Sequence, residues 1–292
     1  MELKKARIYT AMVTPFNEEK KVDIERLEKL INHLLENGTE GILAGGTTGE
    51  SPTLNHDEKL DLYRETVRIV DGRVPVIVGT GSNNTQETVA FTKEVENISG
   101  IDGVLVVAPY YNKPNQSGIF AHFEAVAKAV SLPIMMYNVP GRTGISIDPQ
   151  TTIQLSKIKN IVAIKECASL EAVSEIIEHT DENFLVYSGE DAAAFPAKCI
   201  GANGIVSVAS HAVGKDMAKM YDLLEDGQLQ AAAAIHRKLV PKMNSLFSVP
   251  SPAPTKMYLN HINIETGGVR LPLVPCTEEE KKNILEVIKK DY

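Results

Sequence analysis

The sequence has few cysteines and no long hydrophobic segment near its start. Its three cysteines, Cys167, Cys199 and Cys276, are far apart and form no C-x-x-C motif. This usage predicts a reduced, cytoplasmic protein rather than a disulfide-stabilised secreted one. The apolar run that follows Arg7 is too short for the core of a signal peptide and far too short to span a bilayer. We therefore expect no association with a membrane.

Concentrated positive charge is also missing. The chain of 292 residues carries 30 basic and 38 acidic residues, which gives a formal net charge of −8. No cluster of lysine and arginine is interleaved with aromatic residues, the pattern that is typical of nucleic-acid-binding surfaces. The sequence therefore predicts no nucleic-acid partner.

Signatures of several enzyme classes are absent. The seven histidines are far apart and show no H-x-x-x-H spacing, which disfavours a metal site, although histidines distant in the chain can still converge in a fold. There is no G-x-S-x-G segment of a hydrolase and no dinucleotide-binding fingerprint. The chemistry has to come from other residue types.

What the chain does contain is a regular alternation of short apolar segments with amphipathic helical patterns. Asp23 is placed to cap a helix that closes at Gly38, and a second helix is expected over 56–70. The predicted strands cover residues 8–13, 41–44, 76–79, 103–107, 133–137, 161–165, 184–187 and 204–208. Eight such units are the number that closes a (β/α)₈ TIM barrel.

A doubly wound open sheet is the structural alternative. That fold typically has fewer strands and a phosphate-binding glycine loop after the first of them, whereas Thr14-Pro15-Phe16 follows the first strand here. We therefore predict an α/β fold with a barrel over residues 1–226 and a C-terminal helical appendix over 227–292. In that appendix we expect helices over 231–239 and 255–260, a kinked connector over 250–254 and a terminal helix capped by Thr277.

Lys165 ends the sixth predicted strand, directly after four small or β-branched apolar residues. Such a strand is buried on both faces, and burying an ammonium group is costly. Desolvation lowers a lysine pKa, so that the neutral amine can attack a carbonyl and form an imine. The alternative is a lysine at a strand end that extends to water.

Polar residues follow the other strands, at the end of a barrel where catalytic sites lie. They are Thr47, Thr48 and Glu50 after the second strand, Tyr110 and Tyr111 after the fourth, Tyr137, Asn138 and Arg142 at the fifth, and Ser188, Gly189 and Glu190 after the seventh. A lysine that faces hydroxyls, phenols and a guanidinium suits imine chemistry on an oxo-acid.

Each of these residues also has an ordinary structural interpretation. Tyr137 could be a core tyrosine with a satisfied hydroxyl, and Arg142 a surface residue on a turn. The glycines of the segment 45–49 resemble a phosphate cradle, but no lysine follows them, so a tight turn with close backbone approach is the better interpretation. Only their location at one end of the barrel favours the catalytic hypothesis.

Four motifs together resemble the dihydrodipicolinate synthase/N-acetylneuraminate lyase family of class I aldolases. They are Gly-Gly-Thr47-Thr48-Gly-Glu, Tyr110-Tyr111, Tyr137-Asn-Val-Pro-Gly-Arg142-Thr-Gly and Ile164-Lys165-Glu. They occur in the order and spacing of the family, and the resemblance covers essentially the whole chain. The Arg142 motif and Tyr111 are similar to the branch that condenses pyruvate with L-aspartate 4-semialdehyde. A 2-oxo-3-deoxy sugar-acid aldolase and a non-catalytic binding barrel remain as alternatives.

The resemblance implies a role for each matching residue. Lys165 forms the imine with pyruvate, and Tyr137, Thr47 and Tyr111 relay protons. The resemblance also implies that Tyr111 comes from the neighbouring subunit of a tight dimer within a homotetramer. Thr48 and Arg142 bind the two substrate carboxylates, and Gly189 and Val206 line the site through their backbones. No metal or organic cofactor is implied.

The resemblance also implies a possible allosteric site for lysine, formed by Ser51, Pro52, His56, Lys59, Asn83, Glu87 and Tyr110. Lys59 departs from the pattern, because lysine-sensitive relatives usually have histidine or glutamate at that position. A fixed positive charge disfavours a cationic ligand, and Glu87 would be less available if it paired with Lys59. The sequence therefore predicts weak or absent inhibition by lysine, unless Lys59 points to solvent.

Overall fold

A computed structural model describes residues 2–290 of the chain. Eight parallel strands form a closed barrel in chain order, which confirms the predicted (β/α)₈ class. The strands are β1 (Ile8–Ala11), β2 (Gly41–Ala44), β3 (Val76–Gly79), β4 (Gly103–Val107), β5 (Ile134–Asn138), β6 (Ile161–Glu166), β7 (Leu185–Ser188) and β8 (Gly204–Ser207). The helices between them are α1 (Ile24–Glu36), α2 (His56–Val70), α3 (Thr85–Glu96), α4 (Gln116–Ala129), α5 (Pro140–Thr143), α6 (Pro149–Leu155), α7 (Leu170–His179) and α8 (Ala194–Cys199).

Helix starts follow the capping chemistry of the sequence. The Asp23 side chain accepts a hydrogen bond from the Arg26 amide at 3.0 Å, as predicted for the start of α1. Before α2, Asn55 and Glu58 form a reciprocal capping box. Helix α1 ends at Glu36, two residues before the predicted end, because Gly38 adopts a left-handed φ of 91° that leaves the helix.

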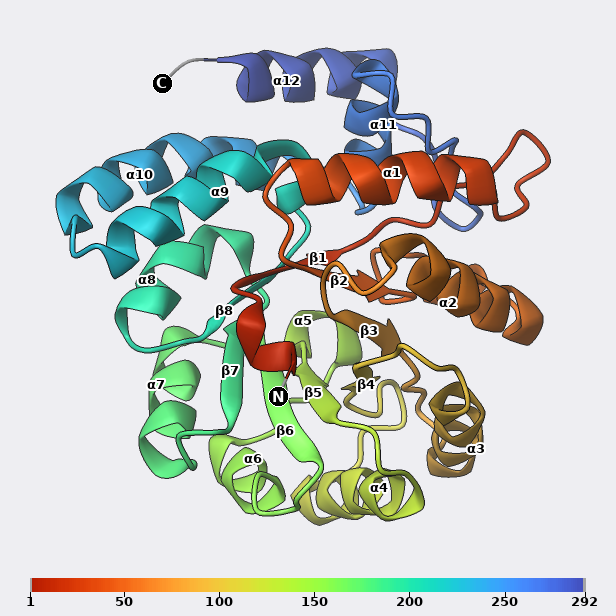
Figure 1. Ribbon diagram of the computed structural model, residues 1–292, viewed down its shortest axis with the longest axis vertical. Coiled ribbons are helices and arrows are strands. Elements are labelled where there is room, and N and C mark those ends of the chain that lie inside the picture. The colour runs from red at the N-terminus through yellow and green to blue at the C-terminus, as the bar shows by residue number, and fades with distance from the viewer. Residues whose placement is uncertain (1, 291–292) are drawn as a thin grey trace. The chain divides into compact units, whose positions relative to one another are not determined.

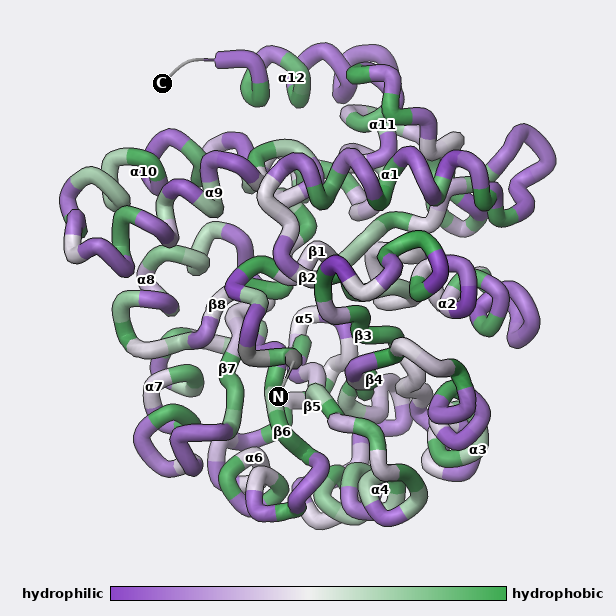
Figure 2. Tube along the Cα trace, in the orientation of Figure 1, coloured by the Kyte–Doolittle hydropathy of each residue, from purple (hydrophilic) through white to green (hydrophobic). Residues whose placement is uncertain are grey.

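The chain forms two compact units, and the first comprises Pro75–Val206 with the residues up to Ala6. Figure 1 shows β5, β6 and β7 of this unit with α4, α6 and α7 outside them. These strands are almost wholly buried and appear as hydrophobic stretches in Figure 2. The Tyr187 hydroxyl of β7 donates to the carbonyls of Leu3 and Ala6, which attaches the short 3₁₀ helix Glu2–Lys5 to the strand.

The second unit comprises Arg7–Val74 and the chain from Ser207 onward. It contains β1, β2, α1 and α2, followed by α9 (Ser210–Glu225), α10 (Leu229–Ser245), α11 (Ala253–His261) and α12 (Glu278–Lys289). Helix α10 packs on α9 and α12, and α11 packs on the same two helices (Figure 1). The capping box at Thr277 is present as predicted. The proposed division of the chain at residue 226 stays a prediction.

Two expectations for this C-terminal region are wrong in detail. Helix α10 is longer than the predicted 231–239, because its last turns continue through Pro241. The predicted connector 250–254 extends too far, since Ala253 and Pro254 already belong to α11. A proline is tolerated in the first turn of a helix because the amide proton that it lacks would have no partner there.

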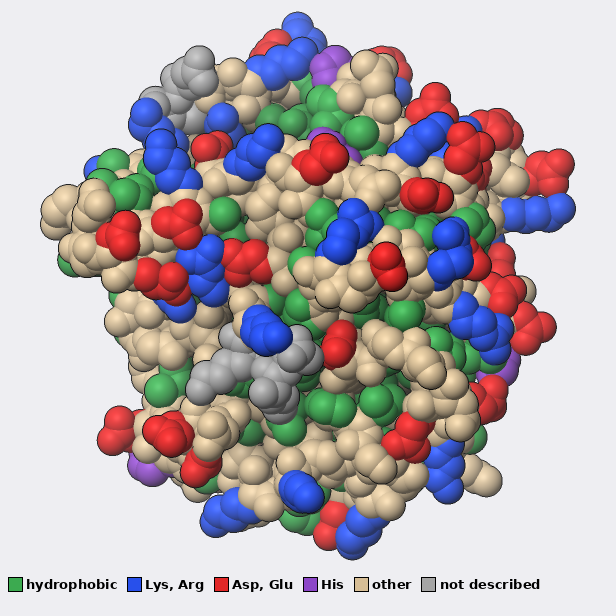
Figure 3. Space-filling model, in the orientation of Figure 1, with side chains coloured by type: hydrophobic (Ala, Val, Ile, Leu, Met, Phe, Trp, Pro, Cys, Tyr) green, Lys and Arg blue, Asp and Glu red, His purple; other side chains and the backbone are tan. Residues whose placement is uncertain are grey.

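The face drawn in Figure 3 carries acidic and basic side chains side by side, with no large area of one sign. This distribution matches the mixed composition of the sequence. Among the described helices, none is long and apolar enough to cross a membrane.

Candidate active site

Lys165 lies near the carboxyl end of β6, in the first unit, and only 6 % of its surface is exposed. Tyr137 of β5 is its cross-strand neighbour, and the Lys165 Nζ lies 4.4 Å from the centroid of the Tyr137 ring. This geometry is a cation–π contact with a phenol whose hydroxyl is suited to proton transfer. The interpretation of Lys165 as a lysine that extends to water is therefore wrong.

The expected direction of the Lys165 pKa is also wrong. Burial, the largest single effect, lowers this pKa, but the combined interactions with Tyr137, Cys167 and Asp191 oppose it and the net shift is upward. An upward shift favours the protonated amine, so a reaction in which Lys165 attacks a carbonyl would begin with removal of a proton. A proton-transfer partner beside Nζ is consequently part of the chemistry.

A buried carboxylate joins the ends of β5 and β6 directly behind this pair. The Asn138 side-chain amide donates to both oxygens of Glu166, at 3.0 and 2.9 Å, and the Ala168 amide donates to one of them at 2.6 Å. Burial raises the pKa of Glu166, and these hydrogen bonds oppose that shift. Glu166 had no assigned role in the sequence-based prediction, and its position directly after Lys165 was the available signal.

Gly189 lies where the backbone approaches Lys165 closely. Its amide donates to the Glu166 carbonyl at 2.8 Å. A β-carbon at this position would lie 2.1 Å from the Cys167 Sγ and 2.7 Å from the Lys165 Cε, so no side chain fits without displacement. Val206, the other residue expected to line the site through its backbone, is fully buried in β8.

Arg142 lies on the short helix α5, directly after β5, and its side chain is exposed. Its positive charge reaches the same region as Lys165. Burial raises the pKa of the Cys167 thiol to about 12 and also raises the pKa of Glu190, whereas the charge of Arg142 lowers both. An exposed guanidinium whose charge acts on Cys167 and Glu190 is available to bind a carboxylate from solution.

Tyr111 is not packed in the interior of its own chain. Its side chain is 87 % exposed, and its φ of 73° is the left-handed conformation that costs energy for a residue other than glycine. The Tyr111 amide donates to the Thr143 carbonyl at 3.3 Å, and the Asn112 side chain donates to the Asn83 carbonyl at 2.9 Å. The loop therefore holds an exposed aromatic ring beside the segment that carries Arg142.

The threonine pair belongs to the second unit. Thr48 is buried and Thr47 is partly exposed. The turn that carries them is closed by hydrogen bonds from the Glu50 amide to the Thr47 carbonyl at 3.0 Å and from the Ser51 amide to the Gly46 carbonyl at 3.3 Å. A left-handed φ of 64° at the first glycine confirms the tight-turn interpretation of this segment.

The residues of the possible lysine site are divided between the two units. In the first unit, Glu87 accepts a hydrogen bond from the Ser82 hydroxyl at 3.4 Å, and Tyr110 is partly exposed. In the second unit, His56 is the first residue of α2 and is exposed, and burial lowers the pKa of Lys59. Lys59 is therefore not a freely solvated lysine.

Within residues 2–290, no group of three or more histidine, cysteine, aspartate or glutamate side chains could hold a metal ion. The chemistry described above needs none, because a lysine, a phenol and hydrogen-bond donors suffice for imine formation.

Comparison with known proteins identifies the family. The model of the dihydrodipicolinate synthetase family matches residues 4–291. This chain belongs to that family. The 4-hydroxy-tetrahydrodipicolinate synthase of Enterococcus faecalis is 53 % identical over 288 residues, which are 99 % of each chain. The solved dihydrodipicolinate synthase of Bacillus anthracis is 48 % identical, with a TM-score of 0.96 over 99 % of each chain.

A further solved relative is the enzyme from Cyanidioschyzon merolae with lysine bound. It is 41 % identical, with a TM-score of 0.95 over 98 % of this chain and 97 % of that chain. The family that the motifs resembled in the sequence is thus confirmed over the whole length of the chain.

Proposed function

We propose that this chain is a lyase that condenses pyruvate with L-aspartate 4-semialdehyde to 4-hydroxy-tetrahydrodipicolinate, on the route to lysine and diaminopimelate. The observation that carries the proposal is the buried Lys165 against the Tyr137 ring at the carboxyl end of β6. This pair of residues occurs in a chain that is 53 % identical, over almost its entire length, to the 4-hydroxy-tetrahydrodipicolinate synthase of Enterococcus faecalis. An imine-forming lysine is what an aldol condensation on an oxo-acid requires.

The reaction begins at Lys165. After loss of its proton, the amine attacks C2 of pyruvate, water leaves and an imine forms. Loss of a proton from the pyruvate methyl group then gives an enamine, whose carbon attacks the aldehyde of the second substrate. The amino group of that substrate then displaces Lys165 from the imine carbon, which closes the ring and frees the lysine. We assign Tyr137 as the proton shuttle: its hydroxyl takes up the proton from Lys165 as it passes its own proton to the relay of Thr47 and Tyr111.

The two carboxylates are bound by different residues. The hydroxyl and backbone amide of Thr48 hold the carboxylate of pyruvate, and the Arg142 guanidinium holds that of the second substrate. Gly189 and Val206 leave room for the imine by presenting backbone rather than side chains. A neutral hydroxyl suits the substrate that stays bound covalently, whereas a guanidinium attracts an anion from solution.

An assay of the purified protein with both substrates tests the proposal. Formation of the cyclic condensation product is expected, and Lys165→Ala is the matched inactive control. A 2-oxo-3-deoxy sugar-acid aldolase would instead cleave its sugar acid and ignore the semialdehyde. A non-catalytic barrel would bind pyruvate without turnover with any aldehyde.

Replacing Arg142 by alanine should impair use of the semialdehyde far more than imine formation with pyruvate. Because the guanidinium is exposed, we expect a rise of about 10-fold to 100-fold in the KM of the semialdehyde. Steady-state kinetics measure that effect, and borohydride trapping of pyruvate measures imine formation. Arg142→Lys keeps the charge but not the bidentate geometry, so its KM for the semialdehyde should lie between those of the unaltered enzyme and Arg142→Ala. An equal loss in semialdehyde use and in trapping of pyruvate would instead show that Arg142 maintains the shape of the whole pocket.

We also propose that the enzyme works as a homotetramer built from two tight dimers, in which Tyr111 completes the site of the neighbouring subunit. Mixing inactive Lys165→Ala subunits with inactive Tyr111→Phe subunits should restore activity, because hybrid dimers contain one site with both residues. Subunit exchange is monitored separately by native mass spectrometry. Exchange without recovered activity would place Tyr111 in the site of its own chain.

Lysine should inhibit weakly or not at all. A lysine at position 59 disfavours a ligand that carries two ammonium groups, because like charges repel. Initial rates at lysine concentrations from micromolar to several millimolar measure the effect, and Lys59→His is the variant expected to gain inhibition. Half-inhibition of the unaltered enzyme below about 1 mM would contradict the prediction.

The cysteines bear on the cellular compartment of the protein. All three cysteines are free thiols, as expected of a protein kept in a reducing environment. A biosynthetic enzyme that uses small metabolites fits the cytoplasm, and we place it there.

A further inference from the structure

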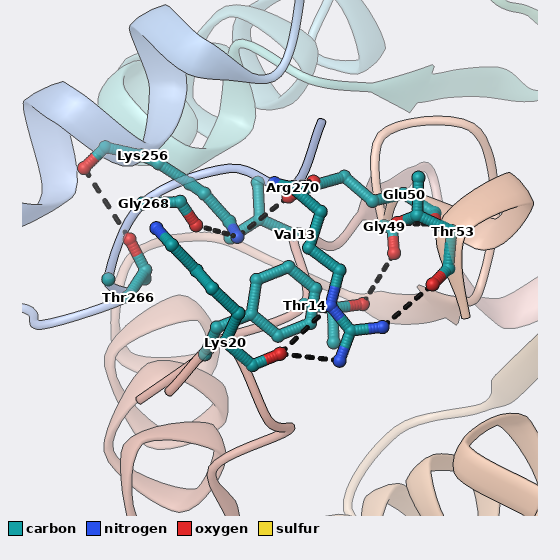
Figure 4. A network of polar contacts seen from close by, with 12 residues as sticks. Val13, Thr14, Lys20, Gly49, Glu50, Thr53, Lys256, Thr266, Gly268 and Arg270 are labelled. Carbon is teal, nitrogen blue, oxygen red and sulfur yellow. Dashed lines mark hydrogen bonds and ion pairs between the residues drawn. The ribbon is translucent and has the colours of Figure 1, made fainter. Parts of the chain in front are cut away.

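The second unit contains a buried ion pair that the reaction described above does not use. The Lys256 Nζ of α11 lies 2.7 Å from the Glu50 Oε1, and the two side chains are 2 % and 0 % exposed. Figure 4 shows this pair between the C-terminal helices and the loop that ends at Glu50. Burying two charges costs free energy that an apolar pair would not cost. Stabilisation of the fold therefore does not explain why this ion pair is present.

Lys256 is held in place from several sides. Its Nζ also donates to the Gly268 carbonyl at 2.9 Å and lies 4.0 Å from the centroid of the Phe16 ring. Burial lowers the pKa of Lys256 to about 8, and the charge of Glu50 opposes that shift. A lysine with this set of contacts has a single orientation, in which it faces Glu50.

Arg270 holds the other side of the same loop. Its backbone amide donates to the Glu50 Oε2 at 2.8 Å, and its guanidinium donates to the Thr53 carbonyl at 2.7 Å and to both oxygens of Glu58 at 2.9 and 2.6 Å. Both oxygens of Glu50 are thus bound by the C-terminal segment. The chain from 50 to 58 is fixed at three points by one residue.

Glu50 is itself in a conformation that needs such support. Its φ is 56°, in the left-handed region, although it is not a glycine. Its amide closes the turn on the Thr47 carbonyl at 3.0 Å, and the Thr14 hydroxyl donates to the Gly49 carbonyl at 2.6 Å. A strained residue persists only where the surrounding contacts determine its position, and Glu50 is two residues after Thr48.

From these contacts we infer that Lys256 and Arg270 are positioning residues of the reaction: through Glu50 they hold the Thr47–Thr48 turn where it binds the pyruvate carboxylate. The inference rests on the proposed role of Thr48. It also assigns a function to the C-terminal helices, because α11 and the chain after it supply the groups that orient the turn. A threonine hydroxyl displaced by about 1 Å loses most of its hydrogen bond to the carboxylate.

The test is the effect of Lys256→Met on pyruvate binding. The KM for pyruvate and the pyruvate concentration that half-saturates borohydride trapping should both rise about 10-fold or more, while the KM for the semialdehyde changes little. Arg7→Met is the matched control, because Arg7 forms ion pairs in the same unit with Glu40, Asp222 and Glu225, none of which belongs to the turn. It should lower the melting temperature and leave the KM for pyruvate unchanged.

Two further variants separate the possible outcomes. If Lys256→Met does not fold, the double variant Glu50→Gln with Lys256→Met removes both charges, and it should fold and still show the raised KM for pyruvate. An unchanged KM for pyruvate in the variant that folds, with a raised KM in Thr48→Val, overturns the inference and leaves the proposed function intact. An unchanged KM in Thr48→Val overturns the role of Thr48 and the inference together.

Discussion

Incubation with pyruvate and borohydride is expected to attach a reduced adduct to Lys165, and Lys165→Ala and Lys165→Arg are expected to abolish it together with essentially all turnover. The imine carbon is reducible, and only a neutral amine can form it. Alanine removes the nucleophile, and arginine replaces it with a group that stays charged throughout the working pH range. Because both variants remove the covalent step itself, we expect the largest losses here.

Peptide mapping by mass spectrometry locates the adduct. Lys159→Ala is the matched control, since this lysine is exposed in the turn before β6 and the variant should be trapped as fully as the unaltered enzyme. An adduct on any other lysine, or full trapping in Lys165→Arg, would remove the basis of the mechanism. Labelled pyruvate confirms that the mass added comes from the substrate.

Gly189→Ala should be the next most damaging change, with a loss in kcat/KM for pyruvate of roughly 100-fold or more. The added methyl group would lie 2.1 Å from the Cys167 Sγ and 2.7 Å from the Lys165 Cε. Side chains cannot approach so closely, so the methyl group displaces the lysine from the carbon that it attacks. The expected signature is slow trapping with a melting temperature that falls only moderately.

A second substitution identifies which contact is responsible. Cys167→Ala removes the sulfur, so the double variant Gly189→Ala with Cys167→Ala relieves the shorter contact and keeps the contact with Lys165. We expect Cys167→Ala alone to be trapped normally and the double variant to stay impaired. Recovery of trapping in the double variant would show that the thiol, rather than the lysine, limits the space beside Gly189.

Much of the barrel can be predicted from local sequence patterns. The predicted bounds of β3, β4 and α2 agree with the structure, because an apolar run with a glycine at one end and a capping box before an amphipathic run are both signals within a few neighbouring residues. The bounds of α10 and α11 are harder to predict from local patterns. Proline is compatible with the first turn of α11 and is accommodated within α10 by tertiary packing, and neither context is visible in the local pattern.

The candidate site also has features that the local sequence predicts and features that it does not. Lys165 alone leaves imine chemistry and a lysine that reaches water as equal alternatives; the polar residues after the other strands favour imine chemistry, and the family motifs extend that prediction to the substrates. The direction of its pKa is not predictable, because it depends on how Tyr137, Cys167 and Asp191 are placed around one nitrogen atom. Electrostatic energy depends on distance in space, which the order of residues does not contain.

The support of the threonine turn is the clearest case of dependence on the tertiary fold. Glu50 is visible in the sequence as the end of a glycine-rich motif, and Lys256 as a lysine in a predicted helix, but nothing in either segment connects them. Their ion pair forms because folding of the second unit buries both side chains at one point, together with Arg270. Local composition determines the chemical groups that the chain has available, whereas long-range packing determines which of those groups meet and what charge they carry there.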